Sequence, residues 1–154
     1  MYNRLIAPLL AASALAFACG QLSYSKETEP PAAAHAAVDT TGQDVVASLD
    51  VKVGASVEVA LNVANAADHR VELVFPDGRT HDVAILDAAG TEVWRWSDGR
   101  LFTSAIQTRL LGSGESTTYG ERWSPAGRRG TYTVVASLHS GNYPVELRQG
   151  ITIE

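Results

Sequence analysis

Alternation of apolar and polar residues with a period of two is the feature that most restricts what this chain of 154 residues can fold into. Successive side chains of a strand point to opposite faces, so this spacing predicts strands with one buried face. Apolar residues at every second position fall in four runs, at Val45, Ala47, Leu49, Val51 and Val53; at Val57, Val59, Leu61 and Val63; at Tyr132, Val134, Ala136 and Leu138; and at Val145, Leu147, Ile151 and Ile153. Beyond residue 43 the apolar residues do not recur at helical spacing.

Short alternating segments separated by turn residues continue through the rest of the chain. About nine strands at intervals of roughly 8 to 12 residues predict an all-β fold, an immunoglobulin-like antiparallel β-sandwich of eight to nine strands. It would occupy residues 43–154 as one domain, a length that suits a single core. Tyr132, at the start of a late strand, is placed like the tyrosine whose hydroxyl bonds back to the preceding backbone in such sandwiches.

Two turn signals and one helical turn complete the expected secondary structure. Pro76-Asp77-Gly78 and Asp98-Gly99 each place a glycine where a tight turn calls for a left-handed backbone. Residues 101–105 are expected to form a single helical turn before the alternation resumes.

The first residues have the layout of a secretory signal. Arg4 precedes an apolar run over residues 5–18 that is too short to be a permanent membrane span. Residues 1–18 are therefore expected to be a signal peptide, and residues 19–42, with two prolines and many alanines, a flexible linker. This organisation predicts an exported protein, periplasmic or at the cell surface.

Two cleavage sites compete at the end of the signal. Ala16-Phe17-Ala18 fits ordinary signal peptidase, whereas Ala18-Cys19-Gly20 resembles a bacterial lipobox, in which the cysteine is acylated and becomes the new N-terminus. Cys19 is the only cysteine and has no partner for a disulfide within the chain. We therefore predict lipid attachment at Cys19, with an unpaired thiol beside a cleavage site as the alternative.

Charge and chemistry narrow the class of function. The formal net charge of −5 argues against nucleic acid as a partner, because phosphate contacts need a basic surface. No histidine has the spacing of a zinc ligand, and no nucleophile motif or phosphate-binding glycine loop occurs. We expect no metal, no cofactor and no catalysis. The alternative, a hydrolase, would need His81 or His139 to lie beside a serine and an acid.

Several segments carry a likeness to a known family. They are residues 59–65, 71–78, 93–102, 113–116 and 130–134, and Trp96-Ser97-Asp98-Gly99 is the most specific piece. Through them residues 57–138 resemble the BsuPI domain family, the intracellular proteinase inhibitors of bacteria. The resemblance implies an immunoglobulin-like sandwich and a role in inhibiting serine proteases. It supplies no reactive residue, and Ser113 stands where the family usually has proline.

An inhibitor of this kind presents a rigid exposed loop whose side chain enters the specificity pocket of the protease. The candidate partner-binding residues are Asp98, Gly99 and Arg100 in one turn, and Arg128 and Arg129 in the loop after Pro125. Arginines at these positions would suit a trypsin-like target. The alternative is a structural or interaction module of the cell envelope that binds through a sheet face or an edge strand, without inhibitory activity.

The tryptophans leave one question open at this stage. Trp94 and Trp96 point to one face of their strand, and Val93 and Arg95 to the other. If the first face is buried, the two tryptophans belong to the core; if it is exposed, they are anchors for a partner. Trp123 carries the same ambiguity.

Overall fold

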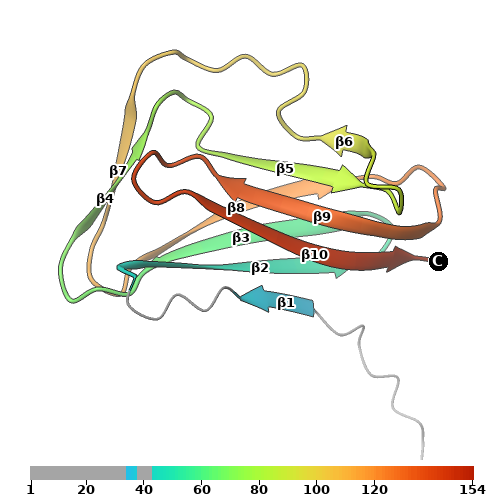
Figure 1. Cartoon of the computed structure of the whole chain (residues 1–154), viewed down its shortest axis with the longest axis horizontal. Helices are drawn as coiled ribbons and strands as arrows, with labels where there is room; N and C mark the ends of the chain where they lie inside the picture. The colour runs from blue at the N-terminus through green and yellow to red at the C-terminus, as the bar shows by residue number, and fades with distance from the viewer. Residues whose placement is uncertain (1–33, 38–42) are drawn as a thin grey trace, which may run out of the picture.

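The computed structural model describes residues 34–37 and 43–154, and every regular element in these ranges is a strand. The strands are β1 (Ala34–Ala37), β2 (Val45–Val53), β3 (Val57–Asn65), β4 (Val71–Phe75), β5 (His81–Leu86), β6 (Glu92–Arg95), β7 (Gln107–Leu111), β8 (Ser116–Trp123), β9 (Gly130–Leu138) and β10 (Val145–Ile153). Figure 1 shows their arrangement along the chain. The all-β class is confirmed.

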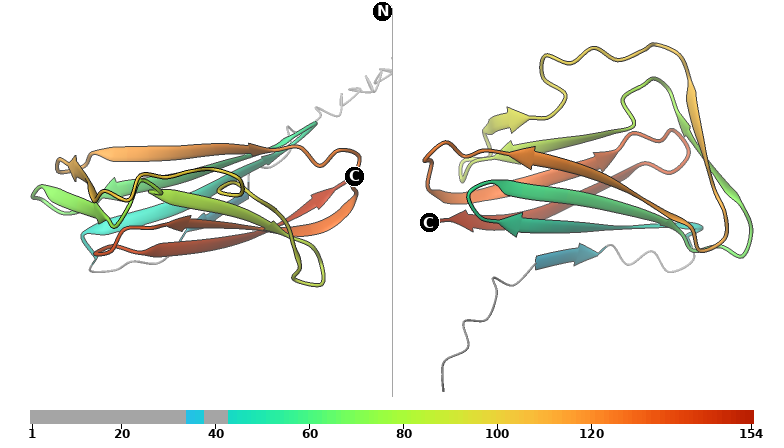
Figure 2. Two further views of the ribbon diagram at one scale, coloured as in Figure 1. Left: turned by 90° about the horizontal axis from the view of Figure 1, so that it is seen from above. Right: turned by 180° about the vertical axis from the view of Figure 1, so that it is seen from behind.

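Two antiparallel sheets form the layers of a sandwich. The first sheet has the order β1-β2-β3-β8 and the second the order β10-β9-β5-β6. Seen from above in Figure 2, the two layers lie one over the other. A separate ribbon, β4 paired with β7, stands at one end of the molecule, at the left in Figure 1. The predicted antiparallel sandwich is confirmed, with this ribbon as an addition.

The core lies between the two layers and follows the alternation in the sequence. In β3 every second residue from Val57 to Asn65 is buried, and β9 repeats this pattern from Tyr132 to Leu138. Leu61 and Val134, one from each sheet, are completely buried. Each such side chain contributes roughly 1.5–3 kcal/mol through the removal of apolar surface from water, so the alternation accounts for most of the stability of the sandwich.

Local expectations had mixed outcomes. The Tyr132 hydroxyl donates to the carbonyl of Arg129 over 3.4 Å, which confirms the bond back to the preceding backbone. Gly99 has a φ of 71°, as expected for its turn. The helical turn at residues 101–105 is wrong, because this segment has no regular structure. Gly78 does not have a positive φ, so a left-handed turn is not the reason for this glycine.

The N-terminal part of the chain is only partly described. The signal peptide, Cys19 and most of the expected linker lie outside the described residues. Within the range expected to be a linker, β1 pairs antiparallel with β2, with Ala34 opposite Val51. In the described part, no helix is long and apolar enough to cross a membrane.

Candidate protein-binding loop

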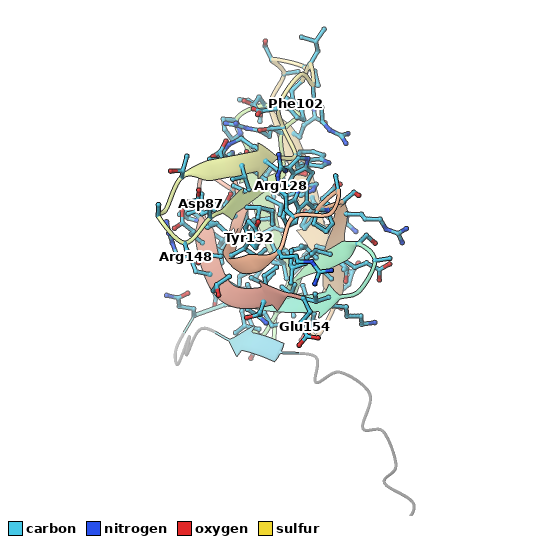
Figure 3. The ribbon with its side chains drawn as sticks, turned by 90° about the vertical axis from the view of Figure 1, so that its right-hand side faces the viewer. Asp87, Phe102, Arg128, Tyr132, Arg148 and Glu154 are labelled. Carbon is cyan, nitrogen blue, oxygen red and sulfur yellow. The ribbon has the colours of Figure 1, made fainter. Side chains whose placement is uncertain are left out.

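The segment between β6 and β7, residues 96–106, is the main irregular feature of the molecule. We call it the β6–β7 loop. It arches over the top of the view in Figure 1, and in Figure 3 Phe102 marks its position above the sandwich. It begins with the Trp-Ser-Asp-Gly sequence and includes Asp98, Gly99 and Arg100 from the sequence-based candidates.

A buried carboxylate fastens the start of this loop. The Asp82 side chain, on β5, is 1% exposed. It accepts hydrogen bonds from the Ser97 hydroxyl (2.7 Å), from the Ser97 backbone N–H (3.2 Å) and from Nη1 of Arg95 (2.9 Å). A fourth donor is the backbone N–H of Val83, at 2.9 Å. Asp82 thus joins β5 to the first residues of the loop.

The electrostatics of this contact favour the charged carboxylate. Burial alone would raise the pKa of Asp82, but the hydrogen bonds from Ser97 and Arg95 and the positive charge of Arg95 together hold that pKa below its usual value. Arg95 also binds Glu92, and these two carboxylates raise the pKa of its guanidinium. Asp82 and Arg95 are therefore both ionised at neutral pH.

Aromatic packing supports the loop from below. The Trp96 ring stacks on His81 of β5 at a centroid distance of 4.3 Å, and His81 in turn lies 4.7 Å from the ring of Tyr119 on β8. Nε2 of His81 is 3.1 Å from a carboxylate oxygen of Glu121, also on β8. Phe102, further along the loop, packs on Trp96 at 5.6 Å. These contacts join the loop to both sheets.

Arg100 is held by the loop itself. Its guanidinium lies over the Trp96 ring at 4.5 Å, and its Nε donates to the Trp96 carbonyl over 2.9 Å. The turn that precedes it is closed by the Arg100 N–H, which donates to the Ser97 carbonyl over 3.1 Å. Asp98 and Gly99 are exposed at the tip of this turn. Arg100 as a residue is exposed, but its charged group already has an intramolecular partner.

The remaining candidate arginines lie on a different loop. Arg128 and Arg129 are exposed between β8 and β9, and the Arg128 N–H donates to the Pro125 carbonyl over 3.0 Å. This loop includes Ala126 at a φ of 51° and Gly127 at 81°. The structure gives no contact between these arginines and Arg100, so the five candidates fall on two separate loops.

The tryptophans belong to the packing of the sandwich. Trp123 is 2% exposed and meets Tyr132 edge to face at 5.3 Å. Trp94, opposite Ile85 in the register, and Trp96 are both half-buried and pack against the core. Both therefore belong to the sandwich, and Trp96 also supports the β6–β7 loop.

The histidines do not assemble a serine triad within residues 43–154. Nε2 of His139 is 3.1 Å from the Ser137 hydroxyl, and burial lowers the pKa of His139. His81 contacts a threonine hydroxyl and the Glu121 carboxylate, but it is only 8% exposed and packs against the rings of Trp96 and Tyr119. In these residues no histidine contacts both a serine and a carboxylate.

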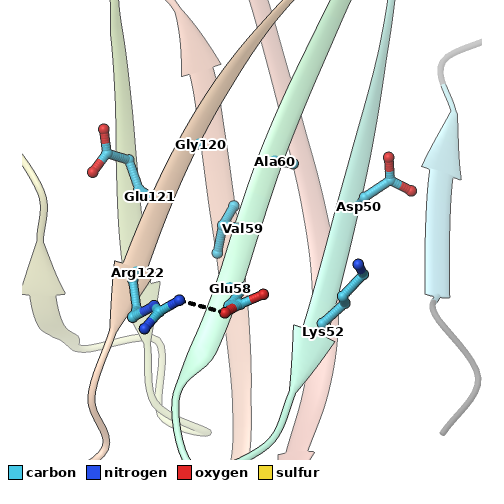
Figure 4. A pocket seen from close by; sticks show the side chains of 8 residues that line it. All are labelled: Asp50, Lys52, Glu58, Val59, Ala60, Gly120, Glu121 and Arg122. Carbon is cyan, nitrogen blue, oxygen red and sulfur yellow. Dashed lines mark hydrogen bonds and ion pairs between the residues drawn. The ribbon is translucent and has the colours of Figure 1, made fainter. Parts of the chain in front are cut away.

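A shallow hollow on the outer face of the first sheet is the other notable surface feature. It encloses about 430 Å³ over β2, β3 and β8. Figure 4 shows the small residues Ala60 and Gly120 between charged side chains, with Arg122 bound to Glu58 at 2.6 Å. A second hollow, of about 510 Å³, lies beside Ser137 and His139. Neither hollow touches the β6–β7 loop.

Sequence reasoning missed two of the residues that build the loop. They are Asp82 and His81, which are not among the partner-binding candidates that the sequence indicates. The available signal was the position of Asp82 directly before the apolar residues 83–86 of β5, since a carboxylate that is buried must find donors.

Comparison with known proteins gives one match to a family. A family model described as BsuPI, intracellular proteinase inhibitor, matches residues 45–143, more than half of the chain. No curated protein matches the chain.

Several solved structures are similar to this chain in part. The β-glucosidase EmGH1 of Erythrobacter marinus is 17% identical over 64% of this chain and 13% of that chain, with a TM-score of 0.35. The GH3 β-glucosidase of Bifidobacterium adolescentis is 17% identical over 79% and 17%, with a TM-score of 0.38. β-Glucosidase 3B of Thermotoga neapolitana is 18% identical over 79% and 16%, with a TM-score of 0.36. The chain spans less than a fifth of each of these proteins.

Proposed function

Because the chain belongs to the BsuPI family of intracellular proteinase inhibitors, we propose that it is a non-catalytic inhibitor that binds a serine protease through the β6–β7 loop. The family description supports the activity. The choice of loop rests on one observation, which is that an exposed segment is fastened to the sandwich at its start by the buried Asp82 carboxylate.

Preorganisation is the physical reason why such a loop suits inhibition. A flexible loop loses conformational entropy when it enters an active site, and this loss weakens binding. In the β6–β7 loop, Ser97 is fixed by Asp82, and Arg100 and Phe102 are fixed by Trp96. The loop can therefore bind with little further ordering.

A second candidate function is an interaction module of the cell envelope without inhibitory activity. It is favoured by the position of β8 at the edge of the first sheet, where one row of its backbone groups has no neighbouring strand in the described residues. An edge of this kind can accept an extended segment of a partner.

Alanine substitution shows which of the two loops with candidate arginines binds the protease. We expect Arg100→Ala to weaken inhibition roughly tenfold, because it removes a cation–π contact and a hydrogen bond that hold the loop. The double substitution Arg128→Ala and Arg129→Ala is expected to leave inhibition within about threefold. The measurement is the inhibition constant of the whole chain against a panel of serine proteases, with the free energy of unfolding of each variant as the control.

The opposite pattern, in which only the double variant loses inhibition, would move the site to the loop between β8 and β9. Binding to a partner protein with no inhibition of any protease would favour the interaction module.

We also propose that the protein is exported and held at a membrane by a lipid on Cys19. The support is the signal-like composition of residues 1–18 and the single cysteine that follows it. In this respect the protein would differ from the intracellular location that the family description names.

Substitution of Cys19 tests the proposed anchor. In a bacterial host the whole chain is expected in the membrane fraction, with a mass increased by acylation, and Cys19→Ser is expected in the soluble fraction without the added mass. A wild-type protein that begins at Cys19 with a free thiol and stays soluble would rule out the lipid and leave simple secretion.

A further inference from the structure

One side chain of the β6–β7 loop points into solvent, and the residues directly before and after it are held by contacts within the molecule. Leu101 is 100% exposed. Before it, Arg100 binds the carbonyl and the ring of Trp96. After it, Phe102 is half-buried and packs on the same ring. Leu101 is thus the apex of a segment that is anchored on both sides.

A further anchor follows Phe102. The Gly78 N–H donates to the Thr103 carbonyl over 2.9 Å, and a Cβ on Gly78 would lie 2.6 Å from Cγ2 of Thr103. The same Cβ would lie 3.2 Å from the Thr103 backbone nitrogen, so a side chain on Gly78 would require Thr103 to shift, and glycine favours this close approach. The Ala105 N–H also donates to the Thr103 hydroxyl over 3.1 Å. The backbone beyond the apex is therefore fixed to the β4–β5 turn.

The exposed apolar surface is concentrated on the same stretch. In residues 43–154 the large apolar side chains that are exposed are Leu101 (100%), Ile106 (69%) and Leu110 (55%), all within ten residues of sequence. Single exposed apolar side chains are common on protein surfaces, but two of these three, Leu101 and Ile106, lie in the β6–β7 loop, which favours contact of this loop with another molecule.

We propose that Leu101 is the side chain that enters the specificity pocket of the protease, and that the target is a serine protease whose pocket accepts large apolar side chains. This inference rests on the proposed inhibitory function. Arg100 is then a positioning residue, since its guanidinium is engaged by Trp96 and is not free to reach a pocket that selects arginine. Ile106, in the same loop, extends the apolar contact beyond the apex, whereas Leu110 lies outside the loop on β7.

The experiment measures inhibition constants of the whole chain against chymotrypsin and subtilisin, whose pockets take large apolar side chains, and against trypsin, whose pocket takes basic ones. We expect inhibition of at least one of the first two and little inhibition of trypsin. Leu101→Ala should weaken that inhibition at least about 30-fold, as expected for the central side chain of an interface. Leu101→Lys should shift inhibition toward trypsin.

A matched control comes from Leu110, which loses the same atoms at another exposed site. Leu110→Ala is expected to change inhibition less than about threefold, and near-ultraviolet circular dichroism should show the native fold for each variant. Inhibition that survives Leu101→Ala, or that falls equally in Leu110→Ala, would overturn the role of Leu101 while the inhibitory function stands. Strong inhibition of trypsin by the wild type would overturn the apolar target. Failure to inhibit any of the three would count against the proposed function and, with it, this inference.

Discussion

Replacing Asp82 with alanine is expected to lower the free energy of unfolding by about 3 kcal/mol, because it removes the acceptor of four hydrogen bonds and leaves the Arg95 charge without its buried partner. This loss of stability is smaller than that expected for a fully buried ion pair, because Arg95 is partly exposed to water. Inhibition should also weaken, by roughly tenfold or more, since Ser97 is no longer fixed. The measurements are chemical denaturation and the inhibition constant.

Asp98 offers a matched control for this substitution. It is a carboxylate of the same loop, exposed at the tip of the turn. Asp98→Ala is expected to change the free energy of unfolding by less than about 0.5 kcal/mol. Equal effects of the two substitutions would show that the burial and hydrogen bonds of Asp82 do not stabilise the loop.

The lowered pKa of Asp82 also fixes the direction of a pH dependence. Its contribution to stability is present above the pKa of an unfolded aspartate, about 3.9, and is lost as the pH falls through the lower pKa of the folded state. The difference in unfolding free energy between the wild type and Asp82→Ala should therefore be constant near neutral pH and shrink below about pH 4. A difference that grows in acid would contradict the charged state assigned to Asp82.

Replacing Asn65 with alanine is the second substitution with a large expected effect. The side chain, in a residue 1% exposed, donates to the carbonyls of His69 (2.7 Å), Leu111 (3.0 Å) and Gly112 (3.0 Å), and it accepts from the Ala67 N–H (2.9 Å). Its loss removes four hydrogen bonds where β3, β7 and two turns meet. We expect a loss of about 3 kcal/mol or more, measured by chemical denaturation.

Asn142 provides the comparison for Asn65. Its side chain also bridges backbone groups, with hydrogen bonds to the Glu72 carbonyl (2.7 Å) and from the Val74 N–H (3.0 Å), but it is exposed, so water can replace it. Asn142→Ala is expected to lower the free energy of unfolding by about 1 kcal/mol.

The inhibition constant of Asn65→Ala, measured under conditions in which the variant is folded, should equal that of the wild type. The reason is that Asn65 does not contact the β6–β7 loop. A loss of inhibition without unfolding would show that the loop depends on this more distant end of the sandwich.

The sequence was sufficient for the framework of the fold. Alternation in residues such as Val57 and Leu61 marks one face of a strand, and this information is local, so the strands and the sandwich class could be predicted. The bond from Tyr132 to the preceding loop could be predicted for the same reason, since it spans only three residues.

The construction of the candidate site could not be predicted in this way. Asp82 is separated from Ser97 by 15 residues, and His81 from Glu121 by 40. The local sequence can indicate that Asp82 needs donors, but it does not say which residues of the loop supply them. Arg100 was chosen as a candidate for its charge, but the structure places that charge against Trp96, and the neighbouring Leu101 extends into water.

Amide hydrogen exchange of the whole chain, alone and with an inhibited protease, tests most directly whether the β6–β7 loop is the inhibitory site. We expect binding to protect residues within 97–106 while the loop at residues 124–130 and the exposed edge of β8 exchange as in the free protein. Protection confined to residues 124–130 or to β8, with no change in residues 97–106, would contradict the proposed site.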